Sequence, residues 1–174
     1  MAKTLLIIIV DLFPQTVLAL LDQIKVFMEA HVLLRPYNKI LLISTYGNEA
    51  AFVYPKSENT RLYSKGDMLE AIQNLRDNLV ESNCKKNGSI GAALTLGVCF
   101  ANRWLNKHKS NDFIDTNNNN IRNNEDASIS NRRARILILT ESMKKDHVEI
   151  DPKAKEYRAV MNCAFSAEKL NILI

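Results

Sequence analysis

The chain has 174 residues, which is enough for one domain with a hydrophobic core and too few for two domains of ordinary size. Lysine and arginine number 23 against 19 aspartates and glutamates, and the excess is spread out apart from Arg132, Arg133 and Arg135, so charge does not indicate a nucleic-acid-binding stripe. The three cysteines are widely spaced, as is typical of reduced intracellular thiols rather than a zinc site. No apolar run approaches the roughly 18 residues of a membrane-spanning helix.

The first apolar run, residues 5–10, predicts the central strand of a parallel sheet. Its six consecutive apolar residues suit a strand that is buried on both faces. The run follows Lys3 and therefore also resembles a signal peptide, but Asp11 interrupts it early and Pro14 follows, which favours the strand. Asp11 would lie at the carboxyl end of this strand, where ligand sites form in such sheets.

Apolar residues recur at helical spacing after Pro14 and predict a long helix packed on the first strand. His31 lies on the apolar face of that helix, and we interpret it as structural. Residues 39–46 and 50–54 predict a second and a third strand, joined by a three-residue turn into an antiparallel hairpin. Pro55 follows the third strand, as suits the edge of a sheet.

Two further helices are predicted before a low-complexity segment. Asp67 is a plausible N-cap of the second helix, and Ser89 opens the third helix, which has small residues in its first turn. Small residues there would allow the helix to approach the sheet closely. Residues 106–132 are rich in asparagine and poor in apolar residues, so we expect a disordered insertion without an assigned role.

The remaining segments complete an α/β pattern. Residues 135–140 predict a fourth strand, Pro152 fits the start of a final helix, and residues 171–174 predict the start of another strand. The predicted fold is a doubly wound, mostly parallel sheet with one antiparallel edge strand and helices on both faces. Since the last strand has no helix after it, we expect a single domain over residues 1–174 that is incomplete at its C-terminus. The apolar stripe predicted for the final helix comprises Tyr157, Val160, Met161, Ala164 and Phe165.

Two carboxylates follow neighbouring strands of this predicted sheet. Asp11 and Glu141 could together hold a divalent cation, or they could be ordinary strand-end carboxylates. Phe13 offers no oxygen ligand and Gln15 offers one amide oxygen. These two positions therefore supply too few ligands for the near-octahedral oxygen shell that Mg²⁺ requires. The chain has no glycine-rich dinucleotide motif, Walker-type lysine motif or serine elbow, so no catalytic residue is predicted. The alternative hypothesis is a Mg²⁺-dependent ligand-binding or phosphoryl-transfer domain that uses Asp11 and Glu141.

The positions of these residues resemble those of a von Willebrand factor A domain. In that family the first strand ends in D-x-S-x-S, a threonine precedes the third helix and an aspartate follows the fourth strand. Here Asp11 is kept, Phe13 and Gln15 replace the two serines, Gly88 falls at the threonine position and Glu141 replaces the aspartate. The resemblance implies the fold together with a degenerate metal-ion-dependent adhesion site, so neither a metal nor a cofactor is expected.

A closer resemblance is to the family of the thirty-four-kilodalton A-domain subunit of the transcription and DNA-repair factor TFIIH. Three phrases carry it: L-L-I-I-I-V-D-L-x-P, G-S-I-G-A-A-L, and M-N-x-x-F-x-A-x-K-x-N-I-L-I at residues 161–174. The resemblance implies a nuclear, non-enzymatic scaffold in transcription initiation and nucleotide excision repair. It also implies docking to a core subunit that carries a zinc-binding ring domain, with no membrane and no direct nucleic-acid contact. Zinc itself is expected only in a family module that would follow residue 174, and Asp11 is expected to cap local backbone.

Overall fold

The computed structural model describes residues 3–12, 14–35, 37–45, 50–55, 65–81, 89–106, 132–140 and 153–174. The asparagine-rich segment expected at residues 106–132 therefore lies almost wholly outside the described residues. None of the described helices is long and apolar enough to cross a membrane. The elements in chain order are β1 (Lys3–Asp11), α1 (Pro14–Leu34), β2 (Lys39–Ser44), β3 (Ala51–Tyr54), α2 (Lys65–Glu81), α3 (Ile90–Asn106), β4 (Arg132–Thr140) and α5 (Lys153–Lys169).

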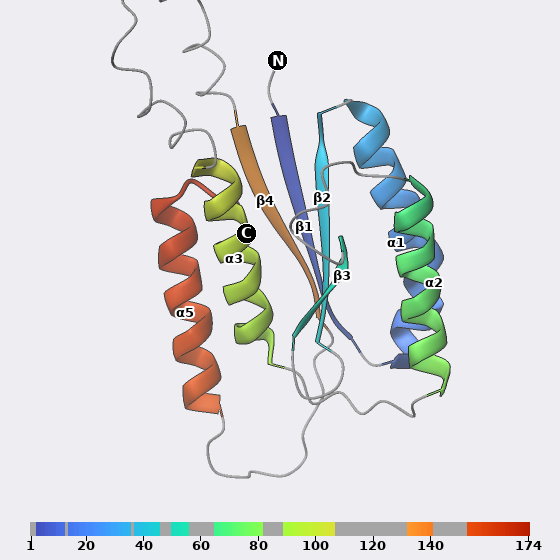
Figure 1. The fold of residues 1–174 in the computed structure, drawn as a ribbon. Coiled ribbons are helices and arrows are strands. Elements are labelled where there is room, and N and C mark those ends of the chain that lie inside the picture. Colours follow the sequence, from blue (N-terminus) through green and yellow to red (C-terminus); the bar gives the residue numbers. More distant parts are fainter. Residues whose placement is uncertain are drawn as a thin grey trace, which may run out of the picture.

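The strands form one sheet in the order β3-β2-β1-β4 (Figure 1). β1 pairs in parallel with both β2 and β4, and β3 pairs antiparallel with β2 at one edge. The predicted strand at residues 171–174 begins beside β4, where the Ile136 N–H donates to the Leu173 carbonyl at 2.7 Å and the Leu173 N–H donates to the Ala134 carbonyl at 3.3 Å. The structure thus confirms the predicted mostly parallel sheet with an antiparallel edge strand.

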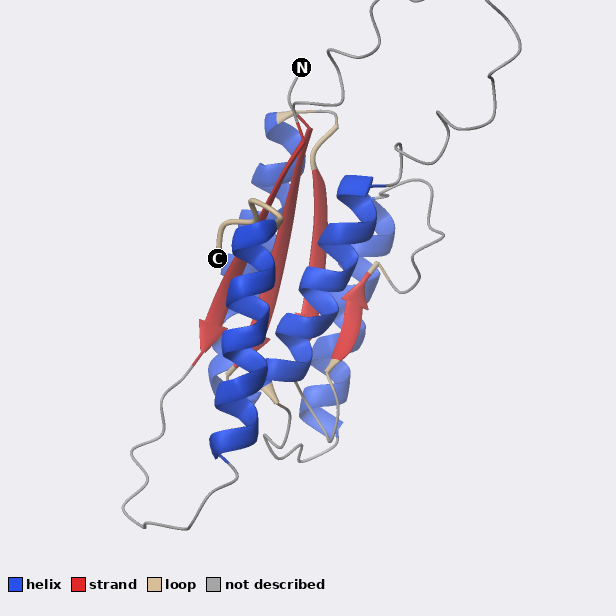
Figure 2. Cartoon of the chain, turned by 90° about the vertical axis from the view of Figure 1, so that its left-hand side faces the viewer, coloured by secondary structure: helices blue, strands red, loops and turns tan. Residues whose placement is uncertain are grey.

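Helices cover the sheet on both sides, with α1 and α2 on one face and α3 and α5 on the other (Figures 1 and 2). Every residue of β1 from Leu5 to Val10 is at most 7% exposed. Even-numbered residues of this run join the core beneath α1 and α2, and odd-numbered ones join the core beneath α3 and α5. Full burial of each such side chain contributes about 1.5–3 kcal/mol, so β1 anchors both cores.

Local sequence sets the helix ends. Ser89 caps α3 as predicted, because its Oγ accepts a hydrogen bond from the Ala92 N–H at 3.3 Å. The C-terminal end of α1 is closed by Asn38, whose amide group donates to the His31 carbonyl at 2.8 Å. Asp67, by contrast, lies inside the first turn of α2 and is not its N-cap, because the helix begins earlier, at Lys65. An acidic side chain in that turn still complements the helix dipole.

The predicted apolar stripe of α5 does not face the core. Tyr157 and Phe165 are 66% and 55% exposed, whereas Cys163 and Ala167 are buried. Of the five predicted residues, Val160 alone packs against the core cluster. The reason is packing: small inward side chains let α5 lie close against α3, and the larger apolar side chains are left outside.

Candidate functional site

The carboxyl ends of β2, β1 and β4 meet around Asp11, which is 6% exposed. Its Oδ1 accepts a hydrogen bond from the Thr45 hydroxyl at 2.7 Å, and its Oδ2 accepts one from the Thr140 hydroxyl at 3.1 Å. Thr45 directly follows β2, and its N–H donates to the Val10 carbonyl at 3.2 Å. Thr140 ends β4 directly opposite Asp11 in the parallel register. One carboxylate therefore links three adjacent strands.

This cluster gives Asp11 a clear structural role. Hydrogen bonds to a charged group are stronger than those between neutral groups, with a net contribution of about 1.5–3 kcal/mol each. The two hydroxyl partners of Asp11 come from segments that are distant in sequence, and the expected capping of local backbone by Asp11 stays a prediction. Neither threonine is a candidate by sequence, although each directly follows or ends an apolar strand run.

The other degenerate adhesion-site positions add little to this cluster. Gln15 is exposed near the start of α1. Phe13, Gly88 and Glu141 lie outside the described residues. The predicted adjacency of the two acid-bearing strands is confirmed, because β1 pairs with β4 through to Thr140. Whether Glu141 approaches Asp11 stays a prediction.

The described residues do not fit a divalent metal site of the adhesion type. Within the part of the chain that the structure describes, no three His, Cys, Asp or Glu side chains gather in a way that could hold a metal ion. Both oxygens of Asp11 accept hydrogen bonds from threonine hydroxyl groups, and phenylalanine at position 13 has no side-chain oxygen. Mg²⁺ requires several oxygen ligands in near-octahedral geometry. The described residues around Asp11 therefore do not form an adhesion-type metal site.

The arginines at the start of β4 divide into a structural residue and two exposed ones. The Arg132 guanidinium lies 5.3 Å from the centre of the Trp104 ring and donates from Nη1 to the Trp104 carbonyl at 2.9 Å. Partial burial lowers the pKa of Arg132. Arg133 and Arg135 are exposed on the other face of the strand.

His31 is half-buried near the same end of the sheet. The pKa of His31 lies below its ordinary value of 6.5, mainly because the side chain is partly buried. Backbone hydrogen bonds at Lys39 and Thr4 raise this pKa, and the charge of Arg135 lowers it. Among the described residues, its Nε2 atom has no hydrogen-bond partner. The neutral imidazole is thus the favoured form, consistent with the predicted structural role.

The outer surface of α5 is the second candidate site. Tyr157, Met161, Ala164 and Phe165 recur at helical spacing on one side of the helix and form what we term the α5 stripe. Three of them are exposed and Met161 is partly buried. On the opposite side, the Cys163 sulfur lies 3.4 Å from the Thr95 hydroxyl of α3, which places that side against the core. The α5 stripe therefore presents two aromatic rings to solvent.

Comparisons with known proteins point to one family. The family model of transcription factor Tfb4 matches residues 4–174. Among curated proteins, the chain is similar to the general transcription and DNA repair factor IIH subunit TFB4 of Kluyveromyces lactis, with 24% identity over 170 residues covering 88% of this chain and 44% of that protein. The Saccharomyces cerevisiae protein of the same name is 21% identical over 181 residues, covering 89% and 47%. The chain thus spans about half the length of the curated relatives it matches.

One solved structure supports the fold. The chain is similar to the N-terminal domain of TFIIH p34, with a TM-score of 0.65 and 20% identity over 99% of this chain and 78% of that one. A weaker likeness to the VWA domain of SpRpn10, with a TM-score of 0.42 and 14% identity over 94% and 82% of the two chains, carries no argument. The predicted fold class is confirmed by the sheet topology and by the first of these neighbours.

Proposed function

The chain belongs to the transcription factor Tfb4 family, and from that premise we propose that it is a non-catalytic scaffold subunit of the core TFIIH complex. It acts in RNA polymerase II transcription initiation and nucleotide excision repair, and it works in the nucleus. The printed names of its relatives, which are subunits of the transcription and DNA repair factor IIH, support this proposal.

The geometry around Asp11 supports the non-catalytic part of the proposal. A catalytic or metal-bound carboxylate needs an oxygen that is directed at substrate or ion. Both oxygens of Asp11 instead accept hydrogen bonds from threonine side chains, and the carboxylate is 6% exposed. The residue that the family fold would use for metal binding therefore serves to hold three strands together.

We assign the docking role to the α5 stripe, and this surface is the single observation that carries the scaffold proposal. Aromatic side chains dominate the energetics of protein interfaces, and Tyr157 and Phe165 are 66% and 55% exposed. The Cys163 side of the helix packs against α3, and the stripe takes no part in that contact. The proposed partner is the core TFIIH subunit that carries a zinc-binding ring domain.

Affinity capture tests the proposal. Tagged full-length protein from nuclear extract of its own organism is expected to bring down the other core TFIIH subunits, identified by mass spectrometry. Capture without any core TFIIH subunit would remove the proposal. A buried-core variant that fails to fold serves as the control for non-specific capture.

A further inference from the structure

The amino ends of β1, β2 and β4 gather cations on one face of the sheet. Lys3 of β1 lies opposite Arg132 of β4 in the parallel register. Lys39 of β2 lies opposite Leu5, two residues further along β1. Leu5 belongs to the core beneath α3 and α5, and side chains alternate between the two faces of a strand. All three cations therefore point to the face that α3 and α5 cover.

Two more cations border this row. The helices α1 and α3 both end at the amino ends of these strands (Figure 1). Arg35 follows α1, and its carbonyl accepts from the Asn38 N–H at 3.0 Å in the turn that leads into β2. Arg103 is exposed in the last turn of α3, next to Trp104, whose carbonyl accepts from Arg132. We term these five cations the basic edge: Lys3, Arg35, Lys39, Arg103 and Arg132.

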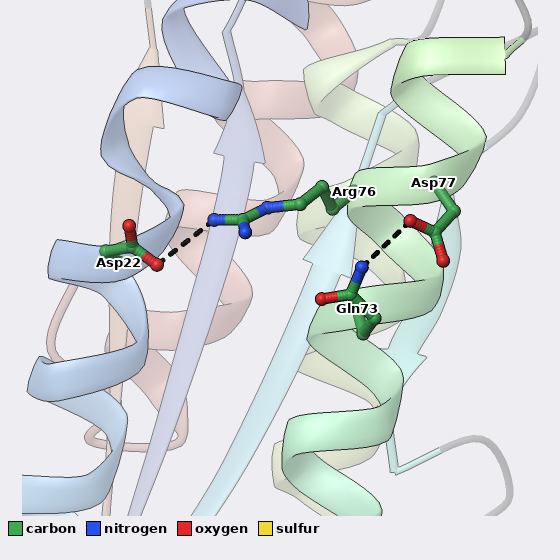
Figure 3. A network of polar contacts seen from close by, with 4 residues as sticks. All are labelled: Asp22, Gln73, Arg76 and Asp77. Atoms are coloured by element: carbon green, nitrogen blue, oxygen red, sulfur yellow. Dashed lines mark hydrogen bonds and ion pairs between the residues drawn. The ribbon is translucent and has the colours of Figure 1, made fainter.

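The described segments that form the basic edge contain no aspartate or glutamate. These segments are the last turns of α1 and α3, the first two residues of each of the three strands, and the described residues between α1 and β2. Glu168 of α5 lines a cavity together with Arg132, but the structure describes no ion pair between them. On the α1–α2 surface, by contrast, Arg76 donates to the Asp22 carboxylate at 3.1 Å (Figure 3).

Aromatic rings, rather than carboxylates, face two of these cations. The Lys3 ammonium lies 5.5 Å from the centre of the Tyr37 ring, which is 55% exposed. The Arg132 guanidinium lies 5.3 Å from the centre of the Trp104 ring. Such contacts contribute about 0.5–1 kcal/mol at exposed sites and leave the positive charge in place. Arginine has five N–H donors, and the bond from Arg132 to the Trp104 carbonyl uses one of them.

The helix ends alone do not account for this charge. The carboxyl end of a helix is equivalent to about half a negative charge. The ends of α1 and α3 together therefore offset about one of the five positive charges. A ligand that carries several negative charges would complement the others.

An extended acidic peptide matches the spacing of the row. Neighbouring strands lie about 4.8 Å apart and each residue rises about 3.3 Å, so the Cα atom of Lys3 lies roughly 5 Å from that of Arg132 and roughly 8 Å from that of Lys39. Alternate side chains of an extended peptide lie about 6.6 Å apart on one side, so carboxylates at alternate positions would reach successive cations. Nucleic acid fits less well, because DNA-binding proteins make on the order of 6–10 phosphate contacts and the basic edge has five cations, one of which already binds a backbone carbonyl.

We propose that the basic edge binds an extended acidic segment of a partner protein, with aspartate or glutamate at alternate positions. Arginine binds carboxylates through paired, charge-assisted hydrogen bonds, which suits Arg132 at the centre of the contact. This inference is independent of the docking role of the α5 stripe, because the two surfaces share no residue.

Fluorescence anisotropy with the full-length protein tests the proposal. The probe is a labelled ten-residue peptide in which glutamate alternates with serine, and glutamine replaces glutamate in the control peptide. The wild type is expected to bind the glutamate peptide at least tenfold more tightly than the control peptide. K3E/K39E is expected to weaken this binding at least tenfold, whereas K25E/R158E, which changes the net charge equally outside the basic edge, should weaken it less than about threefold. Equal losses in the two variants, or equal binding of the two peptides, would overturn the proposal.

A labelled single-stranded oligonucleotide distinguishes an acidic protein from a nucleic acid as the ligand. The wild type is expected to bind the oligonucleotide more weakly than the glutamate peptide at the same salt concentration. Tighter binding of the oligonucleotide that K3E/K39E abolishes would identify a nucleic-acid site and overturn the proposal.

Crosslinking of the wild type covers the case in which K3E/K39E does not fold. A carbodiimide joins peptide carboxylates to nearby lysine amines, and mass spectrometry locates the products. The glutamate peptide is expected on Lys3 and Lys39 at least fivefold more often than on Lys25, which is partly buried as they are. Equal yields at Lys25 would contradict binding at the basic edge.

Discussion

The two faces of β4 have the same backbone and different surroundings. Beneath α3 and α5, Ile136 is 5% exposed; on the opposite face, the adjacent Leu137 is 36% exposed. Both residues belong to one apolar run, so hydrophobicity along the strand does not determine which side is buried. The helices that cover each face determine it. Among the described residues, β4 is therefore more deeply buried on the α3 side than on the α1 side.

The largest effect is expected from matched truncations on these two faces. In the 174-residue chain, Ile136→Ala should lower the free energy of unfolding by about 2–4 kcal/mol, because it opens a cavity in a closed core. Leu137→Ala should cost about 1 kcal/mol or less, since part of this side chain is already in water. Urea unfolding followed by circular dichroism measures both. Equal losses would show that the two faces are equally packed.

Close packing on the α3 side predicts the next effect. A Cβ atom added at Gly97 would lie 3.4 Å from Cγ2 of Ile7, which is an acceptable contact, and larger side chains would have to displace the sheet. Gly97→Leu should therefore destabilise the chain by about 1–3 kcal/mol. Gly97→Ala is the matched control and should change stability by less than about 1 kcal/mol. A tolerated leucine would contradict the close approach of α3.

The hydrogen bonds of Asp11 to Thr45 and Thr140 link β2, β1 and β4 at their carboxyl ends. Asp11→Ala should cost about 1–3 kcal/mol, because it leaves the Thr45 and Thr140 hydroxyls without their acceptor. The wild-type melting temperature should not respond to millimolar Mg²⁺, which differential scanning calorimetry can measure. A rise with Mg²⁺ that Asp11→Ala abolishes would instead support the metal-dependent alternative.

The pH dependence of stability reports on the α1 side. Because the folded pKa of His31 lies below its ordinary value of 6.5, the folded state binds fewer protons than the unfolded state in that range. Stability should therefore be full above about pH 6.5 and should decline as the pH falls toward the folded pKa of His31. His31→Gln should flatten this decline in urea unfolding at several pH values. If the free energy of unfolding of His31→Gln falls with pH as steeply as that of the wild type, His31 is not the cause of the decline.

The smallest effect is expected where α1 meets α2 at the surface. Arg76 and Asp22 are paired at 3.1 Å, but their side chains are 39% and 78% exposed. Solvent screens such pairs, so Arg76→Ala should change stability by less than about 1 kcal/mol, and less still in high salt. A loss of several kcal/mol would mean that the α1–α2 contact depends on this pair rather than on the apolar core beneath it.

Sequence predicts those features that depend on local pattern. The apolar runs located β1 and β4, their parallel adjacency followed from the α/β order, and Ser89 was recognisable as a cap. The partners of Asp11 were not predictable, because Thr45 and Thr140 reach it only once the strand register is known.

The orientation of α5 and the exposure of Leu137 on β4 were not predicted for a related reason. Helical spacing shows that Tyr157 and Phe165 share a side, but it does not show which side is buried. That choice depends on α3, against which the small side chains of Cys163 and Ala167 fit. Similarly, the burial of Leu137 depends on what covers it and not on its own hydrophobicity.

The most direct test of the central claim compares two pairs of exposed apolar residues in the full-length protein. One variant carries Tyr157→Glu and Phe165→Glu on the α5 stripe. The control carries Val26→Glu and Leu33→Glu on the outer side of α1, where the two side chains are 65% and 80% exposed. Quantitative affinity capture from nuclear extract should recover core TFIIH subunits with wild type and with the α1 control, and at least tenfold less with the α5 variant. Undiminished recovery with the α5 variant, or its loss with the α1 control alone, would contradict docking through α5.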